Sequence, residues 1–246
     1  MRTEERTKYE ADRMLNEADR TSDEAGRTPD ETDRSELGRV PRIKLCGLKR
    51  DVDIETANRL RPEYIGFVFA KGSCREVTEE QAAELGRKLL PKIQKVGVFV
   101  REDPQRIVHL LERGIIDIAQ LHGGEDEEYI SRLREMTDRP IIKAFRMDGP
   151  EDVEAARTCT ADYVLLDSGV GGTGTTFDWT LVRGLERPFF LAGGLSPENV
   201  AESVGTLEPF AVDVSSGIET DRRKDPVKME AFVQAVRSAD GQRIEG

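Results

Sequence analysis

From Arg42 onward, short apolar runs alternate with longer polar stretches of helical composition, and this alternation most constrains the fold. The apolar runs are rich in Val, Ile, Leu and Phe, and each has the length of one strand. Strands that are apolar on both faces are typical of a parallel sheet, because helices cover both sides of such a sheet. The pattern therefore predicts an α/β protein in which parallel strands and helices alternate.

We expect eight strands and eight helices in strict alternation. The expected strands are Ile43–Cys46, Tyr64–Phe69, Val96–Val100, Ile116–Leu121, Ile141–Phe145, Tyr163–Asp167, Phe189–Ala192 and Ala211–Val214. The expected helices are Asp53–Arg61, Thr78–Leu90, Pro104–Arg113, Asp126–Thr137, Pro150–Thr158, Asp178–Leu185, Pro197–Val204 and Pro226–Ser238. Eight such units favour closure into a (β/α)8 barrel of the TIM type, and no Gly-x-Gly-x-x-Gly follows the first run to indicate a dinucleotide-binding sheet.

The chain divides at about residue 40. Residues 1–40 are mainly acidic, arginine and small polar side chains, with a loose repeat such as Glu10–Arg13 and Glu17–Arg20. Such a segment buries too little apolar surface to offset the entropy lost on ordering. We expect a disordered, acidic and arginine-rich tail over 1–40, followed by one barrel domain over 41–246, a length that suits a single barrel.

Charge and cysteine content exclude several classes of function. The formal net charge of -11 argues against a general nucleic-acid or anionic-membrane surface. No apolar stretch approaches the roughly 20 residues that cross a bilayer, and the N-terminus lacks the apolar segment of a secretory signal. Cys46, Cys74 and Cys159 form no CxxC pair, so neither a disulfide framework nor a metal site is indicated. We expect a cytoplasmic protein, a monomer or a homodimer.

Glycine and serine crowd the loops after the sixth, seventh and eighth expected strands, where the active site of such a barrel lies. These residues are Gly171, Gly172, Gly174, Gly193, Gly194, Ser215, Ser216 and Gly217. Glycine lets backbone N–H groups approach an anion closely, and a helix that follows favours negative charge at its N-terminus. The loops predict a phosphate site, although tight turns alone would also use glycine.

Cys46 and Asp167 end the first and sixth expected strands, on different sides of the barrel mouth. A thiolate can act as a base, although a free cysteine has a pKa near 8.5 and needs help to ionise. A carboxylic acid can donate a proton if burial or a nearby anion raises its pKa. Two other interpretations stay open at this point: Cys46 as a small buried apolar residue and Asp167 as a turn residue.

Seven segments resemble, in family order, the phosphoribosylanthranilate isomerase family of tryptophan biosynthesis. Together they span residues 43 to about 235 and leave the tail outside. The segments are Lys44-Leu45-Cys46-Gly47-Leu48, Gly66-Phe67-Val68-Phe69 with Ser73 and Arg75, Gln120-Leu121-His122-Gly123, Leu165-Leu166-Asp167-Ser168, Gly171-Gly172-Thr173-Gly174 with Phe177-Asp178-Trp179, Leu191-Ala192-Gly193-Gly194-Leu195 with Pro197-Glu198-Asn199-Val200, and Asp213-Val214-Ser215-Ser216-Gly217-Ile218-Glu219.

The resemblance implies an aldose–ketose isomerase that carries out an Amadori rearrangement without metal or organic cofactor. Asp167 would be the general acid that opens the ribose ring, and Cys46 the general base that removes the C2′ proton. Arg75 matches the family's partner for the anthranilate carboxylate, a role that suits its planar fork of donors. The glycine loops, with Ser216, would hold the substrate phosphate.

Three polar residues keep two interpretations each. Lys44 shares the parity of Cys46, so it could point into the barrel and lower the thiol pKa, or only pair with Asp213. Asp213 could contact the ribose hydroxyls or only neutralise Lys44. His122 ends the fourth expected strand and could line the anthranilate pocket or be structural.

Three other functions remain to be weighed. The histidine-pathway isomerase performs the same rearrangement on another phosphoribosyl sugar with an acidic residue ending the first strand, and Cys46 argues against it. Indole-glycerol-phosphate synthase needs catalytic lysines; Lys44 and Lys143 are available, but the surrounding motifs do not match. A catalytically silent phosphate-binding barrel or scaffold would have no reason to keep Cys46, Asp167 and Arg75 together.

Overall fold

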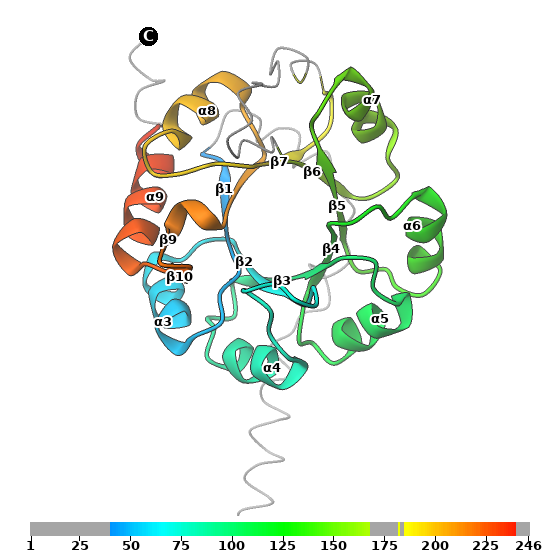
Figure 1. Ribbon diagram of the computed structural model, residues 1–246, viewed down its shortest axis with the longest axis horizontal. Helices are drawn as coiled ribbons and strands as arrows, with labels where there is room; N and C mark the ends of the chain where they lie inside the picture. Colours follow the sequence, from blue (N-terminus) through cyan, green and yellow to red (C-terminus); the bar gives the residue numbers. More distant parts are fainter. Residues whose placement is uncertain (1–39, 168–181, 183–184, 240–246) are drawn as a thin grey trace, which may run out of the picture.

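A closed barrel of parallel strands, β1 to β8 in chain order, forms the molecule, with β8 pairing back to β1 (Figure 1). The computed structural model describes residues 40–167, 182 and 185–239. The strands are β1 (Arg42–Cys46), β2 (Tyr64–Val68), β3 (Gln94–Phe99), β4 (Ile118–Leu121), β5 (Ile141–Arg146), β6 (Tyr163–Asp167), β7 (Phe189–Ala192) and β8 (Ala211–Val214). The predicted (β/α)8 barrel is confirmed.

Helices surround the barrel and cover its outer face (Figure 1). They are α3 (Asp51–Leu60), α4 (Glu79–Arg87), α5 (Pro104–Glu112), α6 (Glu127–Arg134), α7 (Pro150–Thr158), α8 (Val200–Leu207) and α9 (Pro226–Ala239). A short 3-10 turn, η2 (Ser216–Ile218), and a hairpin of β9 (Glu219–Thr220) and β10 (Arg223–Lys224) lie between β8 and α9. The tail, and all but two residues of the helix expected over Asp178–Leu185, lie outside the described residues.

Side-chain caps set several helix starts as the sequence predicts. The side chains of Thr78, Asp103 and Asp126 accept backbone N–H groups in the first turns of α4, α5 and α6. The predicted start of α8 at Pro197 is wrong, because the helix begins at Val200. Asn199 instead uses its side chain to hold the preceding loop, so residues 197–199 form a turn.

The core has two layers. One lies between strands and helices and includes Leu45, Phe99 and Phe232; the other fills the barrel interior. At the amino ends of the strands, Tyr64, Tyr163 and Phe190 close the interior, with ring centroids 5.4 Å and 5.8 Å from Phe190. These rings fill the interior at the amino ends of the strands.

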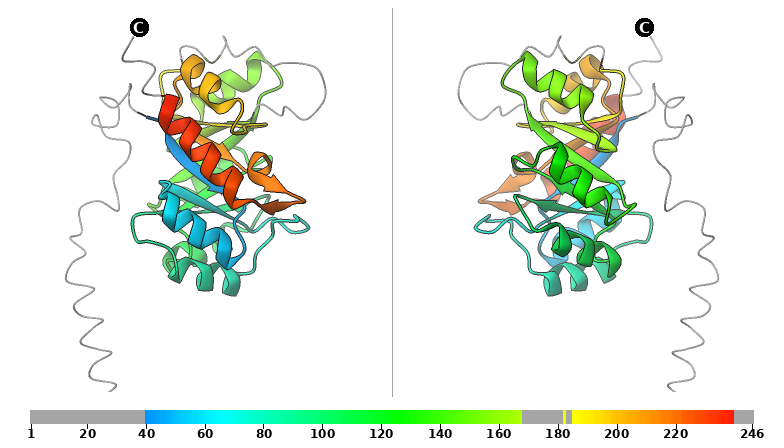
Figure 2. Two further views of the ribbon diagram at one scale, coloured as in Figure 1. Left: turned by 90° about the vertical axis from the view of Figure 1, so that its left-hand side faces the viewer. Right: turned by 90° about the vertical axis from the view of Figure 1, so that its right-hand side faces the viewer.

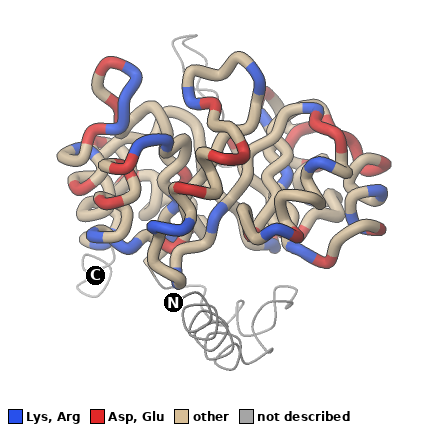
Figure 3. Tube along the Cα trace, turned by 90° about the horizontal axis from the view of Figure 1, so that it is seen from below, with Lys and Arg blue, Asp and Glu red and all other residues tan. Residues whose placement is uncertain are grey.

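Charged positions are distributed over the outside of the barrel. In Figure 3, lysine and arginine positions interleave with aspartate and glutamate positions along the part of the chain that the structure describes. Within the described residues, no helix is long and apolar enough to span a membrane.

Candidate active site

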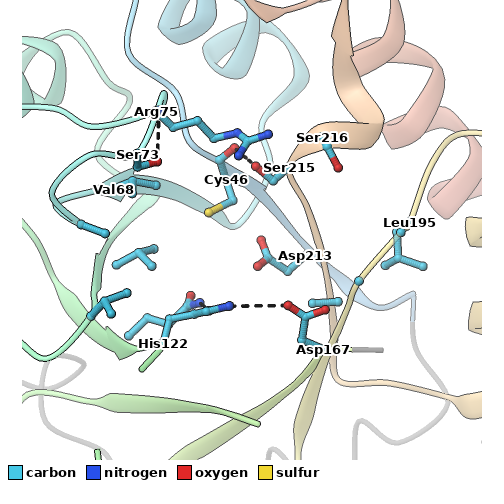
Figure 4. Close-up of a pocket in the computed structure, with 17 residues that line it drawn as sticks. Cys46, Val68, Ser73, Arg75, His122, Asp167, Leu195, Asp213, Ser215 and Ser216 are labelled. Carbon is cyan, nitrogen blue, oxygen red and sulfur yellow. Dashed lines mark hydrogen bonds and ion pairs between the residues drawn. The ribbon is translucent and has the colours of Figure 1, made fainter. Parts of the chain in front are cut away.

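A cavity of about 370 Å³ opens at the carboxyl ends of the strands. Most of the residues predicted for the site line it, and Figure 4 shows them facing one another across the mouth. They are Cys46, Arg75, His122, Asp167, Gly193, Gly194, Asp213 and Ser216. The barrel therefore assembles, from strands far apart in the sequence, the side chains that the motifs single out.

Cys46 ends β1 and points its sulfur into the mouth, beside Val68 and Val98 (Figure 4). Gly66 of the neighbouring strand β2 makes room for it, because a Cβ there would lie 2.7 Å from the Cys46 Sγ. Burial raises the pKa of this thiol, while the positive charges of Lys44 and Lys224 oppose that rise. Burial therefore opposes ionisation of the thiol, and the two lysines favour its thiolate.

Lys44 and Asp213 form a buried ion pair inside the barrel, with 3.0 Å between Nζ and Oδ1. Burial lowers the pKa of Lys44, but attraction to Asp213 and Cys46 outweighs it, and the net shift is upward. Lys44 therefore points inward and pairs with Asp213, and its charge also acts to lower the pKa of Cys46. Asp213 also borders the cavity, so the pairing leaves it available to a ligand.

Asp167, at the end of β6, faces His122 across the cavity, with 3.5 Å between its Oδ2 and His122 Nε2 (Figure 4). Gln120 lies two residues before His122, and its Nε2 is 2.9 Å from His122 Nδ1. When the Gln120 amide donates to Nδ1, the ring proton lies on Nε2 and faces the carboxylate. In that tautomer, the contact with Gln120 orients the His122 ring with its Nε2–H toward Asp167.

Arg75 follows β2 and reaches over Cys46 (Figure 4). Its guanidinium donates from Nε and Nη2 to the two carboxylate oxygens of Glu219, at 2.7 Å and 2.8 Å. Glu219 also accepts from Lys224 at 2.6 Å. In the sequence, Glu219 stands only at the end of a motif, and Lys224 belongs to no motif and was not predicted. The one available signal was an acid placed just after the serine- and glycine-containing loop that follows β8.

The glycine-rich loops are described in part. Gly193, Gly194 and Ser216 border the cavity, whereas Gly171, Gly172 and Gly174 lie outside the described residues. A Cβ at Gly217 would lie 1.9 Å from the Leu195 carbonyl oxygen, so the loops after β7 and β8 can approach only with glycine there. That contact explains the glycine without testing its predicted role at a phosphate.

The described residues offer neither a metal site nor a disulfide. Among the residues that the structure describes, no group of three or more His, Cys, Asp or Glu side chains could hold a metal ion. Cys46, Cys74 and Cys159 are all free thiols.

Comparison with known proteins gives one consistent result. The family model of N-(5′-phosphoribosyl)anthranilate (PRA) isomerase matches residues 43–235. The N-(5′-phosphoribosyl)anthranilate isomerase of Endomicrobium trichonymphae is 45% identical over 203 residues, covering 81% of this chain and 100% of that protein. That of Acetivibrio thermocellus is 42% identical over 213 residues, covering 81% of this chain and 97% of that protein.

Solved structures agree. A crystal structure of phosphoribosylanthranilate isomerase in complex with reduced 1-(o-carboxyphenylamino)-1-deoxyribulose 5-phosphate superposes with a TM-score of 0.72 and 33% identity, covering 80% of this chain and 99% of that one. A structure of monomers generated from the dimeric isomerase of Thermotoga maritima gives a TM-score of 0.72, 33% identity and the same coverage. With its barrel, its cavity residues and its relatives in agreement, this chain belongs to the N-(5′-phosphoribosyl)anthranilate isomerase family.

Proposed function

We propose that this protein isomerises N-(5′-phosphoribosyl)anthranilate to 1-(2-carboxyphenylamino)-1-deoxyribulose 5-phosphate, with Asp167 as general acid and Cys46 as general base. One observation carries the assignment of roles: the two side chains end β1 and β6 and border the same cavity. A ligand between them would meet an acid on one side and a base on the other. The charges of Lys44 and Lys224 oppose, in part, the rise in the Cys46 pKa that burial causes, so they are placed to assist the base.

Asp167 gives its proton to the ribose ring oxygen as the C1′–O bond breaks, which leaves a protonated Schiff base. His122 then stabilises the Asp167 carboxylate through its Nε2–H. The Cys46 thiolate removes the C2′ proton, and the C2′–H electron pair moves to form an enolamine. Tautomerisation of the enolamine gives the ketone. The anthranilate nitrogen carries the positive charge of the Schiff base and becomes neutral when the enolamine forms, so the only proton transfers assigned to the protein are those of Asp167 and Cys46.

Binding is divided between two sides of the cavity. We assign the anthranilate carboxylate to Arg75, because a guanidinium offers paired donors to a carboxylate. The phosphate falls to the loops after β6, β7 and β8, which contribute Gly171, Gly172, Gly174, Gly193, Gly194, Ser216 and Gly217. His122 and Asp213 line the same cavity, and we assign the sugar to them.

The proposal extends to partners and location. The ligand is a phosphorylated small molecule, as in the relative crystallised with reduced 1-(o-carboxyphenylamino)-1-deoxyribulose 5-phosphate. A relative from Thermotoga maritima is dimeric, so light scattering decides between a monomer and a homodimer here. A cytoplasmic location accords with the free thiols of Cys46, Cys74 and Cys159.

The test is the decay of anthranilate fluorescence when purified protein meets freshly generated phosphoribosylanthranilate. Cys46→Ser and Asp167→Asn are each expected to lower kcat by about 10²- to 10⁴-fold, the usual range for loss of a general acid or base. Cys159→Ser, at a buried cysteine outside the cavity, is the matched control and keeps the rate. If the native protein gives no acceleration at low or molar salt, the isomerase proposal fails and a silent phosphate-binding barrel takes its place.

A further inference from the structure

A two-stranded hairpin stands at the carboxyl end of the barrel (Figure 2). It follows Ser215 and Ser216, which line the cavity. Its turn residues, Asp221 and Arg222, both have positive φ, at 50° and 59°. Two consecutive left-handed residues match the twist of a tight hairpin, and here neither is glycine. The hairpin register pairs Glu219 directly with Lys224, so the turn brings these two side chains together.

Lys224 is buried although it is a lysine, with 4% of its surface exposed. Its Nζ is 2.6 Å from Glu219 Oε1, 2.9 Å from the Ser215 carbonyl oxygen and 3.3 Å from the Ser215 hydroxyl. The three ammonium donors therefore each have an acceptor. Burial lowers the pKa of Lys224, while Glu219 opposes that change. A charge is taken out of water here only because Glu219 and the loop after β8 surround it.

Glu219 in turn holds one edge of the Arg75 guanidinium through two parallel hydrogen bonds. Three of the five guanidinium N–H groups remain for a second acceptor. A carboxylate this close also cancels the charge of Arg75, which would weaken attraction to an anionic ligand. Lys224 restores the balance, because Arg75, Glu219 and Lys224 together carry one net positive charge.

We propose that Lys224 is a positioning residue for carboxylate recognition: its buried ammonium offsets Glu219, so that Arg75, fixed on one edge by Glu219, meets the substrate carboxylate as a net cation. The inference rests on the proposed function, since it assigns Arg75 to the anthranilate carboxylate. It adds that the specificity for an aryl carboxylate depends on a residue of the β9–β10 hairpin that does not touch the substrate.

The hairpin is also tied to Cys46 and to the loop that follows it. Arg50, just after that loop, donates from Nη2 to the Lys224 carbonyl oxygen at 2.5 Å. Ser215, the acceptor of Lys224, donates its hydroxyl to the Cys46 carbonyl oxygen at 3.3 Å. Lys224 therefore lies between Arg75, which we assign to the substrate carboxylate, and Cys46, which we assign as the base. Contacts with Glu219, Ser215 and Arg50 hold it there.

The test compares two stable ligands by calorimetry: the reduced product analogue that carries the carboxylate, and its phenylamino counterpart that lacks it. The measured quantity in each variant is the Kd of the ligand without the carboxylate divided by the Kd of the ligand with it. In Lys224→Met, this ratio is expected to fall roughly tenfold, the scale of one unit charge at this range in a partly screened site. In Glu219→Gln/Lys224→Met, the net charge returns to one positive, and most of the discrimination returns with it.

Lys143→Met is the matched control, because Lys143 is also a buried lysine, 5% exposed, paired with Glu125 on the other side of the barrel. It is expected to lose stability without changing the ratio of Kd values. A merely structural role for Lys224 predicts that the double variant is at least as impaired as Lys224→Met. Either that result or an unchanged ratio in Lys224→Met overturns the inference. Failure of the proposed function looks different, since the native protein would then not convert phosphoribosylanthranilate at all.

Discussion

The two ends of the barrel are built from the same strands and have opposite characters. At the amino ends, Tyr64, Tyr163 and Phe190 pack ring against ring, and Arg42 lies over the Phe210 ring with 4.6 Å from its Cζ to the centroid. At the carboxyl ends, the side chains are thiol, carboxylate, imidazole and guanidinium around an open cavity. Along one strand, the surroundings of the inward side chains thus change within a few residues from an apolar core to a polar cavity.

The difference separates stability from chemistry. Apolar and aromatic packing gains free energy without any partner to satisfy, so the amino end can be fully filled. At the mouth, polar groups are partly removed from water, which costs free energy. Their ion pairs offset much of that desolvation cost but add little to the free energy of unfolding. Substitutions at the amino end should therefore change the free energy of unfolding, and those at the mouth should change the reaction.

The largest expected effect at the amino end comes from Phe190→Ala. Phe190 is fully buried and touches the rings of Tyr64, Tyr163 and Phe210. Loss of such a ring costs about 3–5 kcal/mol in the free energy of unfolding. Urea denaturation measures that loss, while kcat of the folded protein should stay near its native value. A variant of native stability with low kcat would show that the two ends are not separate.

Gly66→Ala should change both stability and activity, because it places a methyl group beside the Cys46 thiol. The new Cβ would lie 2.7 Å from Cys46 Sγ and 3.1 Å from Cys46 Cα, so the strand backbone itself must shift. Overpacking of this kind costs about 1–3 kcal/mol, and the displaced thiol should lower kcat as well. Unfolding curves and fluorescence decay on the same preparation measure both. Gly72→Ala is not an equal control, because its φ is +80°; Gly205→Ala, with open space around it on α8, should leave both quantities near native.

The next expected effect concerns protonation of Cys46. Burial disfavours the thiolate more than the nearby lysines favour it, so the titration midpoint should lie above the ordinary value of about 8.5 to 9. Iodoacetamide alkylation followed by mass spectrometry over pH measures the midpoint, with Cys74→Ser removing the exposed thiol. Unfolding in urea should return the midpoint to its ordinary value. A midpoint near neutrality in the folded protein would mean that the cations outweigh burial.

Strand positions and much of the cavity were predictable because both depend on period and parity. Lys44 and Cys46 are two residues apart, so one inward side chain implies the other. Pro150 can only begin a helix, and α7 begins there. The start of α8 was not predictable from Pro197, because Asn199 competes for the backbone through a side chain that reaches Gly194.

The ion pairs around Arg75 could not be read from the sequence. Glu219 lies 144 positions beyond Arg75, and only closure of the barrel, with β8 next to β1, brings them together. Lys224 joins them through a hairpin whose turn residues are Asp221 and Arg222, which carry none of the usual glycine signal. The motifs therefore predict Arg75 itself, but its contacts with Glu219 and Lys224 depend on long-range pairing that no local sequence pattern encodes.

The smallest expected effect tests whether the mouth gives up stability for function. Gln120 is buried, and its Oε1 has no hydrogen-bond partner among the described residues, while its Nε2 contacts His122. Gln120→Leu removes an unsatisfied polar group, so the free energy of unfolding should stay level or rise by up to about 1 kcal/mol. The same change frees the His122 ring, so kcat should fall by a few-fold while KM moves little. Loss of stability together with unchanged kcat would place Gln120 with the structural residues and move the boundary between the two ends of the barrel.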